Sequence, residues 1–279
     1  MRLSVVVTTY NHPEWLEKVL WGFEAQTFRD FELLVADDGS DDRTRELLDR
    51  LRPLLDYPLR HVWHPKQGFR KCTILNAAIA ASEGEYLVFT DGDCIPRRDL
   101  LAVHAAMAAR GRFLSGGYLK LPMETSRAIT REDILEGRST DYAWLRAHGT
   151  PASAQARRLR WGPLLSRLLD GLTTTRPTFN GHNASAWRDD LVRVNGFDER
   201  LEWGGLDREI GERLENAGVK GTQIRHRALV VHLDHGRGYK RPEAIARNRA
   251  IRDEVAAKRL ARTPEGLDRH LAATGGSAR

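Results

Sequence analysis

EYLVFTDGDCIP, residues 85–96, is a short apolar run that ends in two aspartates one residue apart. Residues 86–90 are rich in β-forming side chains and too few for a helix, so they predict a buried strand with Asp91 and Asp93 at its carboxyl end. In an open α/β sheet, ligands bind at that end of the strands. Gly92 lets a ligand approach the backbone, and two carboxylates suit a divalent cation that phosphates also hold. The same pattern also fits a capped turn without any ligand.

Two strands on the amino-terminal side end in similar polar turns. Residues 3–9 are an apolar, β-branched run that breaks at TYNHP, and residues 31–36 are a second run that ends in DDGSDD. Helical spacing of apolar residues follows each run, and we expect a shorter strand at 60–63 and a helix at 72–81. This alternation predicts right-handed βαβ units and a mostly parallel sheet.

The polar turns after these strands are expected to converge in space. Parallel strands end at one edge of a sheet, which would bring together residues 8–11, 37–40 and 91–93. Three converging polar turns indicate a ligand site more strongly than the Asp-x-Asp pattern does alone.

The composition is that of a soluble globular protein with a basic charge balance. The 279 residues can bury a large core, and 41% hydrophobic with 29% charged residues argue against disorder. No apolar stretch approaches the roughly 20 residues that span a bilayer, and we expect no signal peptide. The net charge of +6 favours an anionic partner, for which nucleotide phosphates, nucleic acid and anionic lipid all qualify. The two cysteines, Cys72 and Cys94, are too few for a disulfide framework, so we expect small buried thiols in a cytoplasmic protein.

The middle of the chain is basic and less regular. We expect a helix at 101–109 and a strand at 113–121, whereas 129–157 has no strong strand pattern. In 155–172, four arginines flank leucines and a tryptophan. If helical, this segment fits an amphipathic helix on a membrane surface. It equally fits a helix that packs on the core with a solvated basic face.

A second cluster of glycines, aromatic residues and acids lies in the carboxyl-terminal half. It comprises FNGHNASAW at 179–187, NGFDE at 195–199 and EWGGLDRE at 202–209. Residues 206–215 then have helical spacing, which puts Asp207 and Glu209 near the start of a helix. We expect a strand at 228–233, a charged helix at 242–261 and a loose tail at 274–279.

Four ordered motifs resemble those of family-2 glycosyltransferases of the GT-A fold. They are VVVTTYN at 5–11, VADDGSD at 35–41, EGEYLVFTDGDCIP at 83–96 and WGGLDRE at 203–209. The last motif, together with 179–183 and 196–199, is similar to the carboxyl-terminal galactosyltransferase-type region of bacterial chondroitin polymerases and animal galactosaminyl- and galactosyltransferases.

The resemblance covers residues from about 3 to about 235 and implies an α/β architecture. The expected fold is a Rossmann-like, mostly parallel central sheet flanked by helices, with an acceptor-side region at the carboxyl end. One GT-A domain is expected at 1–240, with a nucleotide-binding half at 1–100 and an acceptor and catalytic half at 101–240. A charged helix and tail would follow at 241–279.

The resemblance assigns the nucleotide sugar to the polar turns. Thr8, Tyr10 and Asn11 match nucleotide-binding positions, and the Asp38 carboxylate would accept a hydrogen bond from the uracil imide N–H. Asp91 and Asp93 match the metal-and-ribose motif, and Asp91 and Gly92 are expected to bind the nucleotide sugar.

The resemblance also implies a metal site. Asp93 is the expected carboxylate ligand, and His232, near the end of a strand, matches the histidine that completes the site. A lone histidine outside such a family is more often structural. Ligation by carboxylate, phosphate and imidazole favours Mn²⁺ or Mg²⁺, and the histidine favours manganese.

Asp207 matches the family's catalytic base. One base without a nearby nucleophile motif implies single displacement with inversion. Glu209 is the local rival, and either acid also fits a helix-start carboxylate. The residues that could contact sugar or acceptor are Asn183, Trp203, Gly204 and Gly205.

Two positions depart from the family pattern. ILN at 74–76 stands where related sequences commonly have Ala-Arg-Asn, so the usual phosphate-contacting arginine is missing. Arg70 or Lys71 would replace it, or both are solvated surface charges. Leu206 precedes Asp207 where an acid is usual, so sugar contacts cannot be carried over from the family.

These features predict a metal-dependent inverting hexosyl- or N-acetylhexosaminyltransferase. It would move a sugar from a UDP-sugar to a glycan hydroxyl, such as a lipid-linked precursor of a bacterial surface polysaccharide, at the inner face of the membrane. One alternative is a phosphohydrolase or nucleotidyltransferase that uses the Asp-x-Asp pattern. Another is a non-catalytic nucleotide-sugar-binding or membrane-docking module of the same fold. A nucleic-acid partner is not expected, because the basic residues are dispersed and form no aromatic-basic platform.

Overall fold

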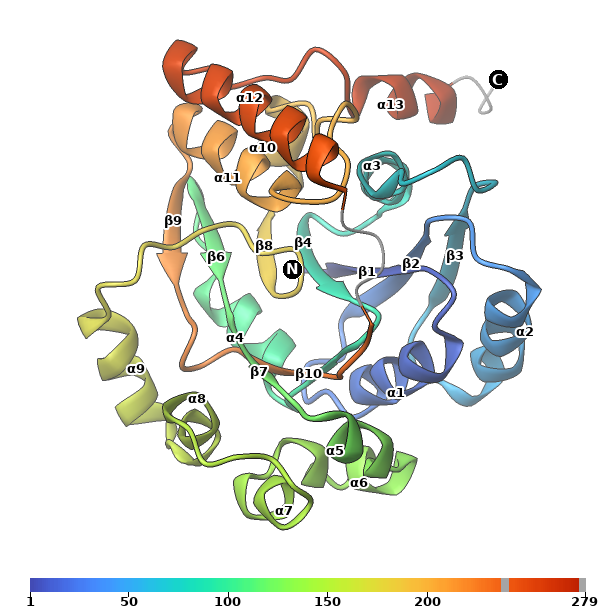
Figure 1. Cartoon of the computed structure of the whole chain (residues 1–279), viewed down its shortest axis with the longest axis vertical. Helices are drawn as coiled ribbons and strands as arrows, with labels where there is room; N and C mark the ends of the chain where they lie inside the picture. The colour runs from blue at the N-terminus through green and yellow to red at the C-terminus, as the bar shows by residue number, and fades with distance from the viewer. Residues whose placement is uncertain (237–240, 276–279) are drawn as a thin grey trace.

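A seven-stranded sheet forms the centre of the protein in the computed structural model (Figure 1). The structure describes residues 1–236 and 241–275. The strand order is β3-β2-β1-β4-β8-β6-β9, and a second sheet has the order β5-β10-β7. The strands are β1 Leu3–Thr9, β2 Phe31–Asp37, β3 Leu59–Trp63, β4 Tyr86–Asp91, β5 Cys94–Pro96, β6 Arg112–Ser115, β7 Gly117–Lys120, β8 Ala184–Trp187, β9 Lys220–Gln223 and β10 Leu229–His232.

The amino-terminal half has the predicted parallel pairing. β1 lies between β2 and β4 and is parallel to both, and β3 extends the sheet beyond β2. β8 is antiparallel to β4 and to β6, whereas β9 is parallel to β6. The expectation of a mostly parallel sheet is therefore confirmed. The β8 sequence ASAW is buried along its whole length, so it lacks the alternation that would have marked it as a strand.

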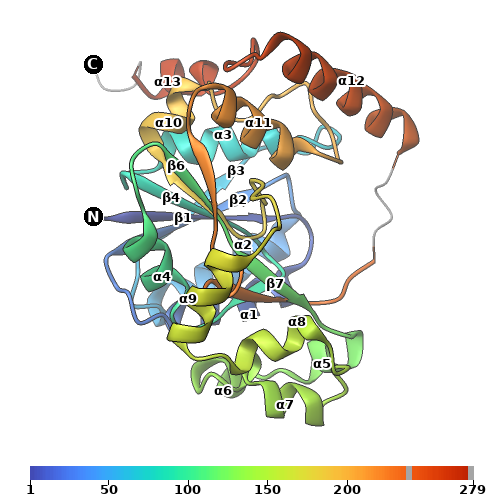
Figure 2. The ribbon, with the colours of Figure 1, turned by 90° about the vertical axis from the view of Figure 1, so that its left-hand side faces the viewer.

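Helices cover both faces of the large sheet (Figures 1 and 2). Apolar side chains of α3, α10 and α11 pack on one face, and those of α1, α2 and α4 pack on the other. Val5 and Val7 of β1 face the α1 side and Val6 faces the α3 side, as the two-residue period of a strand requires. These helices are α1 Pro13–Glu24, α2 Asp42–Leu51, α3 Lys71–Ala81, α4 Leu100–Met107, α10 Arg188–Arg193 and α11 Leu206–Asn216.

The single strand expected at 113–121 is instead two strands in two sheets. β6 belongs to the large sheet, and β7 pairs with β10 in the small one. The break falls at Gly116, where the Asn183 side chain packs so closely that no Cβ would fit. In the small sheet, His232 of β10 pairs with Cys94 of β5, directly after Asp93.

The region between β7 and β8 contains only short helices. They are α5 Met123–Ala128, α6 Arg131–Leu135, α7 Tyr142–Ala147, α8 Ala154–Arg157 and α9 Pro163–Leu172, with 3-10 turns at Arg138–Thr140 and Arg158–Arg160. The segment 155–172 is therefore not one helix, because α8 ends before Gly162 and α9 begins after it. The expectation of a core-packed helix with a solvated basic face is wrong for α9, since Ser166 and Asp170 are buried while most of its leucines are exposed.

Two carboxyl-terminal helices pack on the body of the protein. α12 Pro242–Lys258 lies against α11, and α13 Asp268–Gly275 lies against α3. The expected loose tail is thus helical as far as Gly275, and its remainder lies outside the described residues. Across 1–236 and 241–275, no helix combines the length and the apolar character needed to cross a bilayer.

Candidate active site

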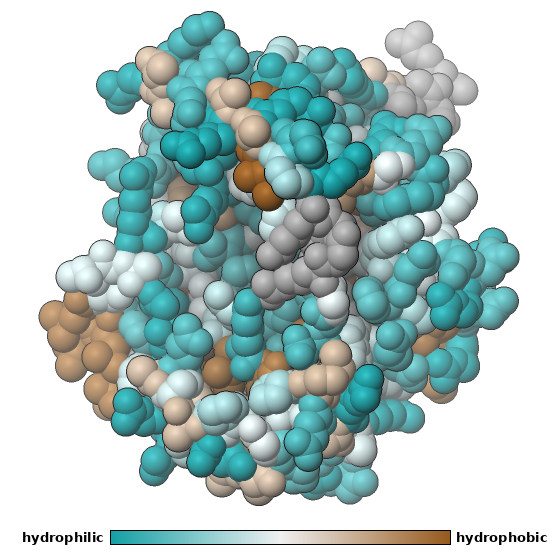
Figure 3. Space-filling view, in the orientation of Figure 1, coloured by the Kyte–Doolittle hydropathy of each residue, from teal (hydrophilic) through white to brown (hydrophobic). Residues whose placement is uncertain are grey.

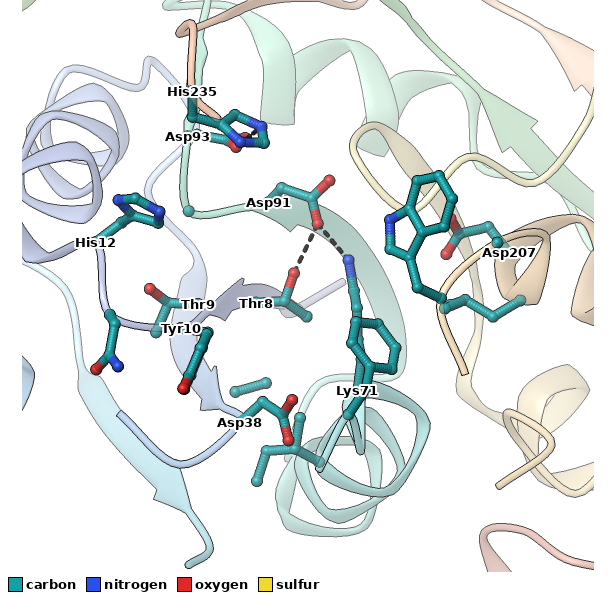
Figure 4. A pocket seen from close by; sticks show the side chains of 18 of the residues that line it. Thr8, Thr9, Tyr10, His12, Asp38, Lys71, Asp91, Asp93, Asp207 and His235 are labelled. Carbon is teal, nitrogen blue, oxygen red and sulfur yellow. Dashed lines mark hydrogen bonds and ion pairs between the residues drawn. The ribbon is translucent and has the colours of Figure 1, made fainter. Parts of the chain in front are cut away.

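A pocket of about 860 Å³ opens at the carboxyl ends of β1, β2 and β4, beside the end of β10 (Figure 4). Its walls come from segments that lie far apart in the sequence. The predicted site residues that line it are Thr8, Tyr10, Asn11, Asp38, Lys71, Asp91, Gly92, Asp93, Trp203, Gly204, Gly205, Asp207 and His232. Arg70 and Asn183 were also predicted but are not among the lining residues.

Backbone hydrogen bonds join the turns that follow the three strands. The Gly92 amide donates to the Thr8 carbonyl at 2.7 Å, and the Asp38 amide donates to the Thr9 carbonyl at 3.1 Å. The polar turns therefore converge as the parallel pairing predicts.

Asp38 is buried among hydrogen-bond donors at one end of the pocket. Its carboxylate accepts from His64 Nε2 at 2.8 Å, from Lys66 Nζ at 2.9 Å and from the Arg70 amide at 3.2 Å. The Arg70 amide also lies 3.3 Å from the other carboxylate oxygen, so each oxygen of Asp38 already has two donors. The Lys66 ammonium also lies 3.7 Å from the centre of the Tyr10 ring. This end of the pocket therefore combines a hydrogen-bonded carboxylate with an aromatic ring.

Lys71, the first residue of α3, is a cation that faces the pocket. Its Nζ donates to Asp91 Oδ1 at 2.6 Å, and the same oxygen accepts from the Thr8 hydroxyl at 2.7 Å (Figure 4). The Arg70 guanidinium instead donates to the Gln67 side chain. Of the two candidates for replacing the missing arginine, only Lys71 lines the pocket.

Charge pairing determines the protonation of Lys71 and Asp91. Burial disfavours the charged form of each, but their mutual attraction, together with hydrogen bonds and charges of other neighbours, outweighs it. The pKa of Lys71 is raised above its ordinary value, and the pKa of Asp91 is held well below its own. Both groups are therefore charged at neutral pH.

Asp93, His232 and His235 form a cluster that fits a divalent cation. Asp93 Oδ1 lies 3.8 Å from His232 Nε2, and Asp93 Oδ2 lies 3.1 Å from His235 Nε2. Each histidine donates its Nδ1–H to a backbone carbonyl, that of Leu233 for His232 and that of Gly236 for His235. These bonds fix the rings with Nε2 toward the carboxylate, which is the orientation a metal ligand needs.

Cys94 also lies in this cluster. One ligand atom each from Asp93, Cys94 and His232 lies within 4.8 Å of the others. The buried Cys94 thiol donates to Asp93 at 3.3 Å, and burial raises its pKa well above the ordinary value. Without a metal, Cys94 is therefore a protonated thiol that holds Asp93. Cys72 is likewise a buried thiol whose pKa burial raises.

Asp207 lies across the pocket from Asp38, in the first turn of α11 (Figure 4). Its Oδ1 atom is buried and has no hydrogen bond of normal geometry, although the Gly181 backbone lies against it and opposes the rise of its pKa. Burial raises the pKa of Asp207 to about 6, with the Lys71 charge opposing this shift and the Asp91 charge adding to it. A carboxylate with a pKa near neutrality is well suited to accept a proton.

Two consecutive glycines connect the pocket wall to α11. Gly204 and Gly205 have φ angles of +107° and +89°, where a side chain would strain the backbone. Asn248 of α12 holds this loop, since its Nδ2 donates to the carbonyls of Glu202, Trp203 and Gly204 at 2.9, 3.2 and 2.9 Å. The loop before Asp207 is thus fixed by a helix from the carboxyl-terminal end of the chain.

Asn183, predicted as a possible sugar contact, is buried in the structure and does not line the pocket. Its side chain is buried, donates to the carbonyls of Gly117 and Ala228, and accepts from His104 Nε2. Asn183 therefore holds β7 beside β10 at the break between the sheets.

Glu209, the rival base, is also buried away from the pocket. Its two oxygens accept from Arg213 Nε at 2.6 Å and Arg213 Nη2 at 2.8 Å, and neither side chain is exposed. Glu209 is therefore a structural partner of Arg213.

Several residues at the site were not predicted from the sequence. His235 had a detectable signal, because it follows His232 at a three-residue spacing beside a strand end. His64 and Lys66 had none, since they reach Asp38 only through the path of the loop before α3. Asn248 reaches its loop only through the packing of α12.

Comparison with known proteins identifies the family of the chain. Residues 4–156, more than half of its length, match the model of glycosyl transferase family 2. The chain belongs to glycosyltransferase family 2. Residues 171–236 match a second family model, described as the N-terminal domain of galactosyltransferase. The family match gives no support to the phosphohydrolase and nucleotidyltransferase alternative.

Curated relatives of this glycosyltransferase are longer than the chain. Validoxylamine A glucosyltransferase of Streptomyces hygroscopicus subsp. jinggangensis is 30% identical over 234 residues, which cover 80% of this chain and 53% of that protein. Chondroitin synthase of Escherichia coli is 27% identical over 245 residues, which cover 80% of this chain and 34% of that protein. The chain spans about half the length of the first relative and less of the second.

Solved structures share the fold over nearly the whole chain. S. aureus TarS in complex with UDP has a TM-score of 0.61 at 17% identity, covering 98% of this chain and 70% of that one. The mannosyltransferase PcManGT of Pyrobaculum calidifontis, in complex with GDP-Man and Mn²⁺, has a TM-score of 0.58 at 20% identity. The match covers 99% of this chain and 79% of that one. The expected GT-A fold is confirmed.

Proposed function

We propose that the chain transfers a hexosyl or N-acetylhexosaminyl group from a UDP-sugar to a hydroxyl group of a glycan, with inversion at the anomeric carbon. The observation that carries this proposal is that Asp38, Asp93 and Asp207 face one pocket from three separate parts of the chain. A nucleotide, a metal-bound diphosphate and an attacking hydroxyl need acids at three such positions.

The residues proposed to hold a metal are Asp93, His232 and His235. Imidazole nitrogens beside a carboxylate favour Mn²⁺ over Mg²⁺, which prefers oxygen ligands. When bound, the cation would offset the charge that develops on the leaving diphosphate. Lys71 supplies a further positive charge to the same pocket.

Asp207 is the proposed base. The acceptor oxygen forms a bond to the anomeric carbon while the bond from that carbon to the diphosphate oxygen breaks, and its electron pair leaves with UDP. The hydroxyl proton passes to the Asp207 carboxylate. Because its pKa is about 6, Asp207 is ionised at neutral pH and is still more basic than an ordinary carboxylate.

Uracil is the proposed nucleobase of the sugar donor. Guanine offers two adjacent N–H donors, which would need both oxygens of Asp38, and His64 and Lys66 already occupy these. The single imide N–H of uracil would have to displace fewer of these donors than guanine would. Among the structural neighbours, TarS has been solved with UDP and with UDP-GlcNAc, whereas PcManGT has been solved with GDP-Man.

The proposed acceptor is a glycan on a lipid carrier at the inner face of the membrane. Two relatives, chondroitin synthase and the poly(ribitol-phosphate) beta-N-acetylglucosaminyltransferase TarS, are named for polymers. The net charge of +6 would favour an approach to anionic lipid or to phosphate-linked carriers.

The test is turnover of a panel of UDP-sugars with glycan acceptors and Mn²⁺, for the wild type and Asp207→Asn. We expect turnover that needs the metal and falls by about 10²–10⁴-fold in Asp207→Asn, the usual contribution of a general base. The exposed Asp189→Asn is the matched control and should retain activity. Near-normal activity of Asp207→Asn would remove this residue as the base. Metal-dependent UDP binding without turnover on any acceptor would favour the non-catalytic module.

A further inference from the structure

Helix α9 has its apolar side toward solvent. Leu164, Leu165, Leu168 and Leu172 are 84%, 45%, 57% and 67% exposed, and at this spacing they lie on one face of the helix. In the space-filling view this leucine face forms a brown patch at the left edge of the molecule, over α9 (Figure 3). Four of the nine large apolar side chains that are exposed in the described residues therefore belong to one ten-residue helix.

A buried acid holds α9 in this orientation. Asp170, on the side opposite the leucine face, accepts from the His226 amide and from His226 Nδ1, both at 2.9 Å. Its other oxygen accepts from Arg227 Nε at 2.7 Å. The polar side of α9 is therefore fixed to the loop before β10. Rotating the leucines inward would leave a buried charge network unpaired, which costs several kcal/mol.

The leucine face belongs to a basic stretch of the chain, with Arg167 on α9 itself and Arg157 and Arg160 in the short helix and turn before it. Arg157, Arg160 and Arg167 are exposed, and none has an ion pair with the described acids. The only acid between residues 151 and 178 is Asp170, which is already paired. An apolar face in a basic stretch is the pattern of a helix that lies in the interface of an anionic membrane.

We propose that α9 docks on the surface of an anionic lipid bilayer, with the leucine face at the boundary between headgroups and acyl chains and the three arginines against lipid phosphates. A symmetric contact with a second copy of the chain is less suited to this surface, because it would place the basic stretches of the two copies together. The proposal goes beyond sugar transfer and does not depend on it, since lipid binding is measured without donor or metal.

Docking at α9 would also orient the pocket. The chain runs from the end of α9 through residues 173–180 to Gly181, whose backbone lies against the Asp207 carboxylate. A membrane bound at α9 would thus be connected by a short segment to the proposed base.

The experiment is co-sedimentation of the whole chain with phosphatidylglycerol-containing vesicles at low salt, compared with pure phosphatidylcholine vesicles. We expect binding to the anionic vesicles that weakens as salt is raised. The triple variant Leu164→Gln, Leu168→Gln and Leu172→Gln should lose at least about tenfold in affinity, because buried leucines supply apolar transfer energy. Leu54→Gln is the matched control, since Leu54 is 53% exposed on another part of the surface.

A second triple variant tests the charges. Arg157→Gln, Arg160→Gln and Arg167→Gln should together reduce binding to anionic vesicles by at least about tenfold at low salt. The control replaces three exposed arginines elsewhere, Arg45, Arg249 and Arg262, with glutamine and should bind as the wild type does.

Three results would overturn the proposal. They are no binding of the wild type to anionic vesicles at low salt, equal binding of the leucine variant and the wild type, and a wild-type dimer that the leucine variant converts to a monomer. The last result would make the leucine face an interface between copies. Circular dichroism of each variant is the control for folding. If a variant is folded, its loss of binding can be assigned to the substituted surface residues.

Discussion

Two carboxylates in the same pocket have opposite electrostatic surroundings. Asp91 accepts from Lys71 and Thr8, so its pKa stays low and it remains ionised throughout the neutral range. Asp207 has a buried oxygen without a hydrogen bond of normal geometry, and burial raises its pKa to about 6. When the surroundings move the pKa values of two acids apart, one acid stays charged and the other can exchange a proton. This difference between single residues supports Asp207 as the base.

The pH dependence of transfer tests this assignment. Because the base must be ionised and its pKa is about 6, kcat/KM should fall by about tenfold for each pH unit below 6 and level off above it. The measurement is the pH profile of kcat/KM at saturating metal, with protein stability checked at each pH. A plateau that continues unchanged down to about pH 4, the range of an ordinary carboxylate, would contradict the assignment.

At the scale of elements, α11 separates a catalytic candidate from a structural pair. Asp207 precedes Glu209 by two positions, and two helical positions differ by about 200° around the axis. Asp207 therefore faces the pocket while Glu209 faces the interior and meets Arg213 one turn further along. Arg213 also donates to the carbonyls of Val194 and Gly196, which ties α11 to the turn after α10.

Glu209→Gln should therefore reduce stability without removing the chemistry. It leaves the buried Arg213 charge without its partner, so we expect a loss of about 3–5 kcal/mol in the free energy of unfolding. The measurement is urea unfolding, with kcat determined per folded molecule. Glu212→Gln on the same helix is the control, because its ion pair with Arg252 is partly exposed and should cost about 1 kcal/mol or less. A loss of kcat that matches Asp207→Asn would restore Glu209 as a candidate base.

At the scale of the whole molecule, the proposed metal site joins the two sheets. Asp93 follows β4 of the large sheet, whereas His232 ends β10 of the small sheet. Asp38 and Asp207 lie in the amino-terminal and carboxyl-terminal halves of the chain. A metal with a nucleotide would thus contact several separate segments and should stabilise the folded protein as one unit.

Thermal unfolding with ligands tests the combined site. At a hundred times its dissociation constant, a ligand stabilises by about 2.7 kcal/mol, which for a domain of this size raises Tm by roughly 5–10 °C. We expect this shift with UDP and Mn²⁺ together, and a smaller one with either alone or with GDP and Mn²⁺. Asp93→Asn should abolish the dependence on Mn²⁺. An equal shift with UDP in the presence of a chelator would contradict the metal site.

Much of the fold could be predicted from local patterns. Each strand of the amino-terminal half is a contiguous apolar run, and parallel pairing then requires the polar turns after β1, β2 and β4 to meet. The prediction of one continuous strand at 113–121 is wrong, because the residues remain β-forming across the break between β6 and β7 and give no local sign of it. The cause of that break, Asn183 packed on Gly116, comes from a distant part of the chain.

The sequence by itself therefore determined the α/β class, the acidic strand ends and the position of Asp207 near a helix start, because these depend on periodicity and on neighbours in the chain. Only the tertiary structure decided which candidates face the pocket. It placed Lys71 rather than Arg70 there, added His235 beside Asp93, and turned Asn183 and Glu209 into the interior. It also decided which side of α9 is exposed, since periodicity defines an apolar face but not its direction. That direction is fixed by Asp170, whose partners His226 and Arg227 are distant in sequence and meet it only in the folded chain.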